Sequence, residues 1–315
     1  MIGSLLIAIA AGAASAVMFA STMSGVMMSL VLASFAPVPL MVAAIAWGRL
    51  CAAIGGLAAT ACVFMIFGAA RGELFALAVA LPAWWLGHLV LLGRPVSDPA
   101  GHAGTEWYPT DNILLWIAML AALTVAIFLG TDMSQLEQGM RQLLPRALAQ
   151  AGVSDAVDVQ RLVELTVFLA PPMMTIIMTV VLSVNLAVAA KITSISGRLI
   201  RPWPRLRDTK LPLMTIPALV AIIGLCFMSE PVGLLARMTA AALLTAYALT
   251  GFAVLHTLTL LMRTRPLWLG LAYAPLLTFV WPLPMLAMTV LGLADAAFDL
   301  RHRFGPRQPP PLPVP

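Results

Sequence analysis

The sequence predicts an all-α, polytopic membrane protein with about eight to ten transmembrane helices and with both termini in the cytoplasm. Of the 315 residues, 61% are hydrophobic and only 10% are charged, against about 45–50% and about 25% in soluble proteins. The apolar runs are long and continuous, unlike the alternating segments of about ten residues in outer-membrane barrels. The basic residues gather in a few short loops. This composition excludes a soluble domain and a disordered chain.

Charged side chains mark the ends of the expected spans, because a helix that crosses about 30 Å of hydrocarbon needs about 20 apolar residues. We expect eight spans, at residues 3–20, 25–47, 50–70, 74–92, 113–129, 165–190, 211–227 and 232–261. A further apolar stretch, 267–298, is interrupted at Trp281-Pro282-Leu283-Pro284. Proline removes a backbone donor and breaks helices, so we expect this stretch to form two short helices in a hairpin.

The first span contains Ala14-Ser15-Ala16, which is similar to a signal-peptidase site. A signal peptide begins with a positively charged region. No charged side chain precedes Arg49, so we expect the first helix to be retained.

Lysine and arginine predict the orientation, because they are enriched in the cytoplasmic loops of membrane proteins. The segment 191–210 has one acidic residue, Asp208, and several basic ones: Lys191, Arg198, Arg201, Arg205, Arg207 and Lys210. We therefore expect a basic cytoplasmic loop there. An even number of crossings then places the basic C-terminal residues on the same side. The net charge of +5 follows from this topology, so no nucleic-acid partner is expected.

Within the basic loop, Arg201, Trp203 and Arg205 are candidates for contact with a partner or with lipid. Arginine beside tryptophan at the inner surface suits anionic lipid head groups, and contact with another protein is the alternative. Lysine occurs only at Lys191 and Lys210, a bias typical of GC-rich bacterial genomes. We expect the protein to lie in a bacterial inner (plasma) membrane, with the lipid bilayer as its first partner.

We expect one transmembrane domain over residues 1–305 and a proline-rich, disordered tail at 306–315. The segment 131–164 falls on the outer side. It has apolar residues at helical spacing: Leu136, Met140, Leu143, Leu144 and Leu148. An amphipathic helix on the outer leaflet is expected, and a lid over a cavity is the alternative. Pro145 is expected to bend or end this helix.

No motif of catalysis is present. The chain has no paired-histidine zinc signature, nucleophile elbow, P-loop or glycine-rich dinucleotide turn. The three cysteines, Cys51, Cys62 and Cys226, lie in apolar runs and lack ligand spacing. We therefore expect no catalytic residue, no metal site and no cofactor, and we do not expect an enzyme.

Polar and ionisable side chains inside spans are candidate ligand-binding residues by default. His88 and His256 lie near the inner ends of their spans, and Asn185 lies within the sixth span. The alternative for each is a side chain satisfied by a neighbouring helix or by head groups. A charge ladder is expected at the inner end of the last helix, at i, i+4 spacing: Asp295, Asp299 and Arg303.

Two proline pairs begin similar segments, Pro37-Val38-Pro39-Leu40-Met41 and Pro282-Leu283-Pro284-Met285-Leu286. Each segment leads into an apolar run that heads toward the cytoplasm in the expected topology. Paired proline-interrupted segments indicate a substrate site in transporters, because broken helices expose backbone groups. Pro37, Pro39, Pro282 and Pro284 are therefore candidate ligand-binding positions.

Small residues recur at every fourth position of the first and third spans, at Ala8, Gly12, Ala16 and Ala20 and at Ala52, Gly56 and Thr60. Such stripes allow helices to approach closely. They predict tight packing, either within the fold or against another membrane subunit.

Three segments carry a family resemblance: Ala-Pro-Val-Pro-Leu-Met at 36–41, Ala-Tyr-Ala-Leu-Thr-Gly-Phe-Ala-Val-Leu-His at 246–256, and Gly-Leu-Ala-Asp-Ala-Ala-Phe-Asp-Leu-Arg at 292–301. They resemble the YybS-like predicted membrane proteins, the family called domain of unknown function 2232. The resemblance covers nearly the whole chain up to about His302. This family is distantly similar to the S components of energy-coupling-factor vitamin transporters, which capture substrate. The resemblance therefore implies a helical membrane fold and capture of a small solute.

Two functions follow from these observations. The leading hypothesis is a membrane protein that binds a small solute in a cavity between helices, resembles an S component, and depends on a separate energising complex. The alternative is a non-catalytic scaffold of the cell envelope. It would recruit partners through the basic loop, the small-residue stripes and the tail.

Overall fold

The structure, a computed structural model, describes residues 2–25, 27–97, 103–150, 156–202, 209–278 and 281–304. The elements, in chain order, are α1 (Ile2–Ala20), η1 (Ser21–Ser24), α2 (Met27–Ser34), α3 (Pro37–Trp47), α4 (Arg49–Phe67), α5 (Ala69–Phe75), η2 (Ala76–Ala80), α6 (Leu81–Val90), β1 (Gly93–Ser97), β2 (Ala103–Trp107), α7 (Thr110–Gln150), α8 (Ala156–Ile195), α9 (Thr215–Leu225), α10 (Val232–Leu258), α11 (Arg265–Tyr273), η4 (Ala274–Leu277), α12 (Pro282–Phe298) and α13 (Leu300–Phe304). The predicted helical class is confirmed, with one two-stranded ribbon added.

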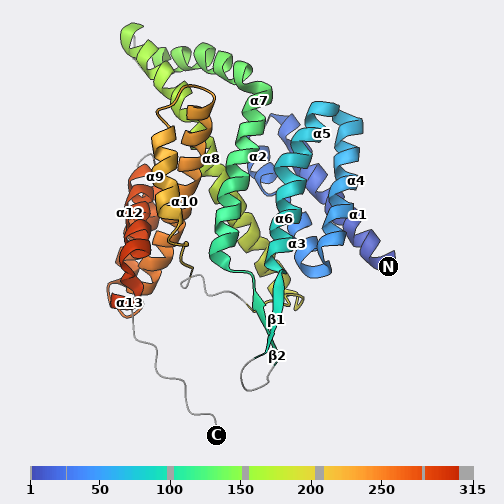
Figure 1. The fold of residues 1–315 in the computed structure, drawn as a ribbon. Helices are drawn as coiled ribbons and strands as arrows, with labels where there is room; N and C mark the ends of the chain where they lie inside the picture. Colours follow the sequence, from blue (N-terminus) through green and yellow to red (C-terminus); the bar gives the residue numbers. More distant parts are fainter. Residues whose placement is uncertain are drawn as a thin grey trace.

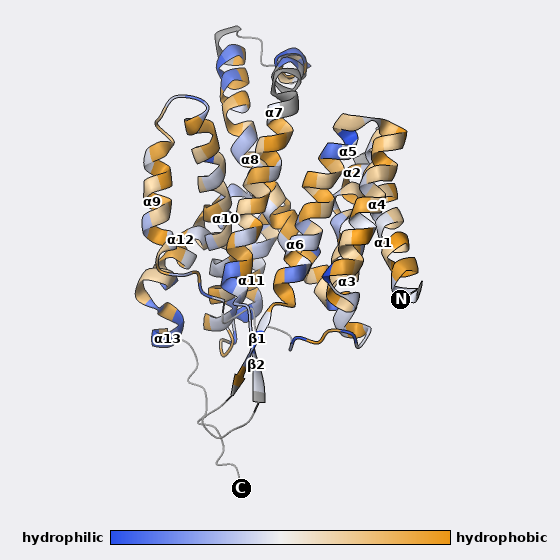
Figure 2. Cartoon of the chain, turned by 45° about the vertical axis from the view of Figure 1, so that its right-hand side comes forward, coloured by the Kyte–Doolittle hydropathy of each residue, from blue (hydrophilic) through white to orange (hydrophobic). Residues whose placement is uncertain are grey.

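Within the part of the chain that the structure describes, seven helical segments are long and apolar enough to cross a membrane: Gly3–Met23, Met28–Trp47, Arg49–Phe67, Ala69–Val90, Thr110–Gly130, Val159–Ile195 and Val232–Leu258. Each coincides with a predicted span. Their outward faces carry large apolar side chains, among them Leu57, 72% exposed, and Met65, 81% exposed. Figure 2 shows hydrophobic residues over the outside of the helices. Soluble monomers rarely expose apolar patches of this extent, so these faces suit contact with lipid.

The helices pack side by side, and the ribbon of β1 and β2 projects from one end of the molecule, here called the ribbon end (Figure 1). The start of α1 and the short helix α13 also lie toward the ribbon end. At the opposite end, here called the far end, α7 and α8 extend beyond the other helices. The segments predicted to be cytoplasmic thus share one end of the molecule, as an even number of crossings requires. The side of the membrane on which this end lies stays a prediction.

Three of the predicted crossings are short. α9 has 11 residues and α12 has 17, while α11 has 9 and continues only as the 3-10 helix η4. At about 1.5 Å per residue, α9 rises about 16 Å, roughly half the hydrocarbon thickness. The predicted break is present, because α12 begins at Pro282 and packs against η4. The stretch 267–298 therefore forms two helical segments, as expected.

The ribbon has no counterpart among the predicted elements. β1 and β2 pair antiparallel, and Arg94 Nη2 lies 2.7 Å from Glu106 Oε2 across the pair. Both side chains are exposed, so this ion pair contributes little to stability.

The predicted amphipathic segment 131–164 is helical over its described residues, but it is continuous with α7 and α8 and is not a separate element. α7 passes through Pro145 and ends only at Gln150, so of the two predicted effects of this proline, a bend or an end, the end does not occur. In Figure 1 the later part of α7 turns away from the first part and lies across the far end. Residues 151–155 and the predicted tail 306–315 lie outside the described residues, as do Trp203 and Arg205.

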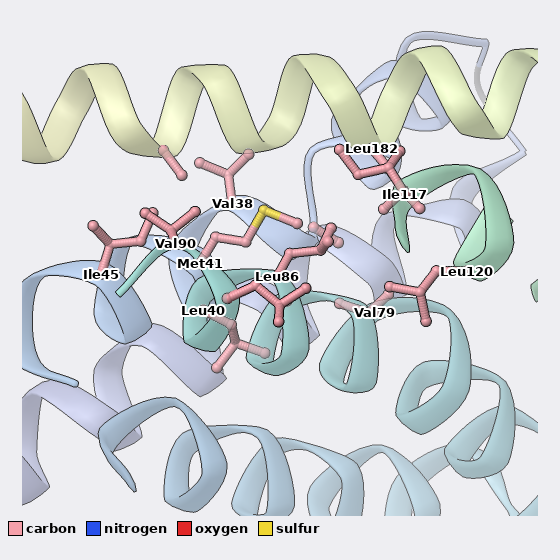
Figure 3. Packing of buried hydrophobic residues seen from close by; sticks show 14 of the residues in the cluster. Val38, Leu40, Met41, Ile45, Val79, Leu86, Val90, Ile117, Leu120 and Leu182 are labelled. Atoms are coloured by element: carbon pink, nitrogen blue, oxygen red, sulfur yellow. The ribbon is translucent and has the colours of Figure 1, made fainter. Parts of the chain in front are cut away.

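The largest core cluster lies where α3 packs against α6 and α8, and α7 adds residues to it (Figure 3). α3 contributes Leu40 and Met41, α6 contributes Leu86, and α8 contributes Leu182, all fully buried. α3 is apolar on every side because it is enclosed by other helices, and such a helix belongs in a protein interior.

α1 and α4 approach each other closely through small residues. A Cβ atom at Gly12 would collide with the carbonyl oxygen of Gly55, and one at Gly55 would collide with the carbonyl oxygen of Ala8. The predicted stripe on the first helix therefore packs within the fold. On α4 the contact is made by Gly55, whereas the predicted Gly56 faces Ala80 of η2.

Candidate functional site

A cavity of about 700 Å³ lies between α7, α8 and α10. Its walls are mostly apolar and include Ile113 and Ile117 of α7, Leu186 of α8 and Leu249 of α10. Small-molecule sites have volumes of about 300–1,000 Å³ and mostly apolar walls with a few polar groups. None of the described lining residues belongs to the segment 131–164.

A buried arginine lines the cavity. Arg201, in the segment after α8, is only 8% exposed. Its Nη1 donates to the carbonyl oxygen of Val90 at 3.4 Å. Val90 is the last residue of α6, where carbonyl groups lack partners within the helix. Burial lowers the pKa of the Arg201 guanidinium.

A histidine and a tyrosine meet at the same cavity. His256, near the end of α10, places its Nε2 3.0 Å from the hydroxyl oxygen of Tyr273 of α11. The Tyr273 ring stacks on Phe252, with ring centroids 4.9 Å apart. A neutral imidazole both donates and accepts, so this pair ties α11 to α10 and can also bond a polar ligand.

The wall at the ribbon end is held by a buried ion pair. Asp295 is 1% exposed, and its Oδ2 lies 2.7 Å from Arg301 Nη2. Arg301 Nη2 also donates to the carbonyl oxygen of Thr209 at 2.8 Å. Thr209 lines the cavity, and its hydroxyl oxygen lies 3.4 Å from that of Thr110. The C-terminal residues therefore fix the position of one cavity wall.

This ion pair replaces the predicted charge ladder. Asp299 has a positive φ of 53° and ends α12 in the left-handed conformation. The chain turns there, and the backbone N–H of Arg301 donates to Asp295 Oδ1 at 3.0 Å. Asp295 therefore pairs with Arg301, and Asp299 pairs with Lys210 instead of with Arg303 four positions along. Aspartate is one of the few residues besides glycine that tolerates the left-handed region.

Two glycines position α10 as a cavity wall by allowing α12 to pack tightly behind it. A Cβ atom at Gly251 would collide with the carbonyl oxygen of Met288, and one at Gly292 would collide with the carbonyl oxygen of Tyr247. The Tyr247 hydroxyl is buried and lies 2.5 Å from Thr215 Oγ1, at the start of α9.

The first proline break is satisfied by the protein itself. Between α2 and α3 the Val38 N–H bonds to the carbonyl oxygen of Phe35, which leaves the Ser34 carbonyl without its usual helical donor. Asn185 Nδ2 of α8 donates to this carbonyl at 2.8 Å. Asn185 is 1% exposed, and its Oδ1 has no hydrogen-bond partner among the described residues. The carbonyl group that is left free at this break is thus occupied.

The two proline pairs do not come together. Pro37 and Pro39 lie at the start of α3, and Pro282 and Pro284 lie at the start of α12, on opposite sides of the molecule (Figure 1). None of the four lines the cavity. Each pair occupies the first turn of a helix, where the missing N–H has no helical acceptor.

Of the predicted site residues, Arg201 and His256 line one cavity, whereas Asn185 faces α2 from the opposite side of α8. His88 stacks on Trp84 of the same helix, with ring centroids 6.4 Å apart, and does not line the cavity. The lining residues that were not singled out from the sequence include Thr110, Thr209 and Tyr273. Their only signal is polarity next to the end of an apolar run, which many loop residues share.

Comparison with known proteins gives one family match. A family model described as predicted membrane protein (DUF2232) matches residues 13–296. The chain belongs to the DUF2232 family. No curated protein and no solved structure matches it. Together with the seven apolar helices, the DUF2232 match makes this a multi-pass membrane protein in contact with the lipid bilayer.

Two of the three segments that carry the resemblance to DUF2232 lie against each other. Residues 246–256 belong to α10, and residues 292–301 belong to α12 and α13, which pack on α10. They supply the glycine contact, His256 and the pair of Asp295 with Arg301. The segments that resemble DUF2232 therefore build one side of the cavity.

Proposed function

We propose that this DUF2232 protein binds a small solute in the cavity between α7, α8 and α10, as the membrane component of a transport system similar to an S component. The observation that carries the proposal is the cavity of about 700 Å³, with apolar walls and a few polar groups toward one end. Binding sites between helices of a bundle have this character. The proposal includes no catalytic step, and a separate complex supplies the energy for transport.

The cavity lies nearer the ribbon end, which the basic residues predict to be cytoplasmic. Solute in this conformation is therefore exchanged with the cytoplasmic side. In a bacterial inner membrane, this is the state expected after uptake or before export.

The alternative scaffold function depends on a basic loop that is free to meet partners. Arg201 is buried against α6 and the cavity, so it is not presented on the surface as that function requires. Of the candidate contact residues, Trp203 and Arg205 lie outside the described residues. The burial of Arg201 favours the solute-binding proposal.

The proposal is tested by filling the cavity. Ala253 of α10 lines it, and Ala58 of α4 is exposed on the lipid-facing surface. The wild-type protein, the Ala253→Phe variant and the Ala58→Phe variant are purified in the same detergent, and the small molecules retained by each are measured by mass spectrometry. We expect a compound that is retained by the wild type and by Ala58→Phe and is lost from Ala253→Phe. Identical profiles for all three proteins would contradict the proposal.

A further inference from the structure

The described lining of the cavity has a positive charge and no negative one. Among its described lining residues Arg201 is the only arginine or lysine, and none is an aspartate or a glutamate. Within the described part of the chain no carboxylate forms an ion pair with Arg201, whereas the nearby Arg301 is paired with Asp295. An arginine that is about nine-tenths buried without a counter-charge is unfavourable unless a further group satisfies it.

The hydrogen bond to α6 does not satisfy this guanidinium. The group has five N–H donors. Its bond to the Val90 carbonyl oxygen is 3.4 Å long, beyond the usual 2.7–3.2 Å range for N–H···O bonds. The bond to the end of α6 therefore stabilises the guanidinium only weakly. The remaining N–H donors of Arg201 are available to a group in the cavity that it lines.

The rest of the cavity has a different character. Arg201 bonds to Val90, shortly before β1, and Thr110 begins α7 shortly after β2, with its hydroxyl 3.4 Å from that of Thr209, so these polar groups lie toward the ribbon end. The walls between α7, α8 and α10 are mainly aliphatic. A molecule complementary to both parts has a small polar anionic group at one end and an apolar body.

We infer that the cavity binds an amphiphile with a single anionic head group, a carboxylate or a phosphate, held by Arg201, with its apolar body between α7, α8 and α10. This inference rests on the proposed solute-binding function and names the chemical class of the solute. Arginine binds carboxylate and phosphate groups with two parallel hydrogen bonds, which fits this role. The amphiphile comes either from the soluble phase or from the membrane lipids, because both sources offer the same chemistry.

The test uses protein in nanodiscs of phosphatidylcholine, with dodecanoate as the anionic probe and dodecanol and dodecyltrimethylammonium as neutral and cationic probes of the same chain length. Binding to protein-free nanodiscs is subtracted. We expect the wild type to bind dodecanoate about 10- to 100-fold more tightly than dodecanol, as loss of a charged hydrogen bond implies. Arg201→Gln removes this preference and leaves dodecanol binding unchanged, while Arg201→Lys retains part of it.

Arg198→Gln is the matched control, because Arg198 lies in the same loop but is exposed, with its guanidinium 4.7 Å from the Trp47 ring centroid. It should keep the full preference for dodecanoate. A second set of nanodiscs containing phosphatidylglycerol distinguishes the sources. Competition of this lipid with dodecanoate in the wild type, but not in Arg201→Gln, supports a lipid head group, and absence of competition supports a soluble amphiphile.

Equal binding of all three probes by the wild type would overturn the inference and leave the proposed cavity function standing. This comparison needs no variant, so it holds even if Arg201→Gln fails to fold. Binding of no probe would overturn both the inference and the proposed function. An equal loss of preference in Arg198→Gln and Arg201→Gln would also overturn it, since the general charge of the loop would then be responsible.

Discussion

The two sides of α8 show two ways in which one membrane fold treats polar groups. On the side of α1–α6, glycines at helix contacts let the backbones meet, and the buried Asn185 bonds to the carbonyl oxygen of Ser34. On the side of α7 and α10, the helices leave a cavity, and the buried Arg201 has one long hydrogen bond. On the first side, here called the packed side, the amide nitrogen of Asn185 has a carbonyl partner within the protein. On the second side, here called the cavity side, the remaining N–H donors of Arg201 have no partner among the described residues.

A polar residue in or beside a span therefore does not by itself mark a ligand-binding site. Asn185 and Arg201 are both buried. They differ in the hydrogen-bond acceptor that the protein offers. The break between α2 and α3 frees a carbonyl group for Asn185 at 2.8 Å, whereas the path of the loop after α8 leaves Arg201 with one bond of 3.4 Å among the described residues.

The largest expected effect concerns the ion pair that fixes the wall of the cavity side. Asp295→Asn leaves the largely buried Arg301 without a counter-charge, and removal of one partner of a buried pair costs about 3–5 kcal/mol. We expect a large fall in the melting temperature of the protein in detergent. The measurement is thermal unfolding of the purified variant beside the wild type.

Lys210→Gln is the control, because it removes an exposed ion pair, that of Lys210 with Asp299. The hydrogen bond from Lys210 lowers the pKa of the Asp299 carboxyl. An exposed pair contributes about 0–1 kcal/mol, so its loss should change the melting temperature little. If Asp295→Asn melts at the wild-type temperature, the C-terminal residues do not hold the cavity wall.

A smaller effect on stability is expected from the difference in free volume between the packed side and the cavity side. Ala59 of α4 is 3% exposed in the main core, and Ala253 of α10 lines the cavity. Phenylalanine at Ala59 overpacks a filled region, which costs about 1–3 kcal/mol. At Ala253 it enters existing space, so the change should stay within about 0.5 kcal/mol. Thermal unfolding of Ala59→Phe and Ala253→Phe measures both, and equal destabilisation would show that the two sides are packed alike.

The spans were predictable because hydropathy is a local property of the sequence. All seven long helices coincide with apolar runs bounded by charged or breaking residues. A span was predicted at 211–227, but the shortness of α9 within it and the ribbon were not predicted. A helix of 11 residues and strands of five residues are set by their neighbours, since segments this short have little stability of their own.

The site was predictable only in part. Arg201 and His256 could be named because they are polar residues at the ends of apolar runs. Their joint position at one cavity depends on the packing of α7, α8 and α10, which no spacing in the sequence encodes. The pairing of Asp295 with Arg301 depends on the left-handed conformation of Asp299, which turns the chain. The sequence does not reveal this turn, because the residues around Asp299 fit a continuous helix equally well.

The difference between the two sides is tested most directly by two alanines on one helix. Ala187 of α8 lines the cavity, and Ala189, two residues later, is fully buried against the packed side. Each is changed to cysteine in a protein whose Cys51, Cys62 and Cys226 are replaced by alanine, and labelling with a small maleimide is followed over time, with and without dodecanoate. We predict that Ala187→Cys is labelled and is protected by dodecanoate, while Ala189→Cys stays unlabelled. Labelling of both at the same rate, or of Ala189→Cys alone, would contradict the assignment of the cavity to this side of α8.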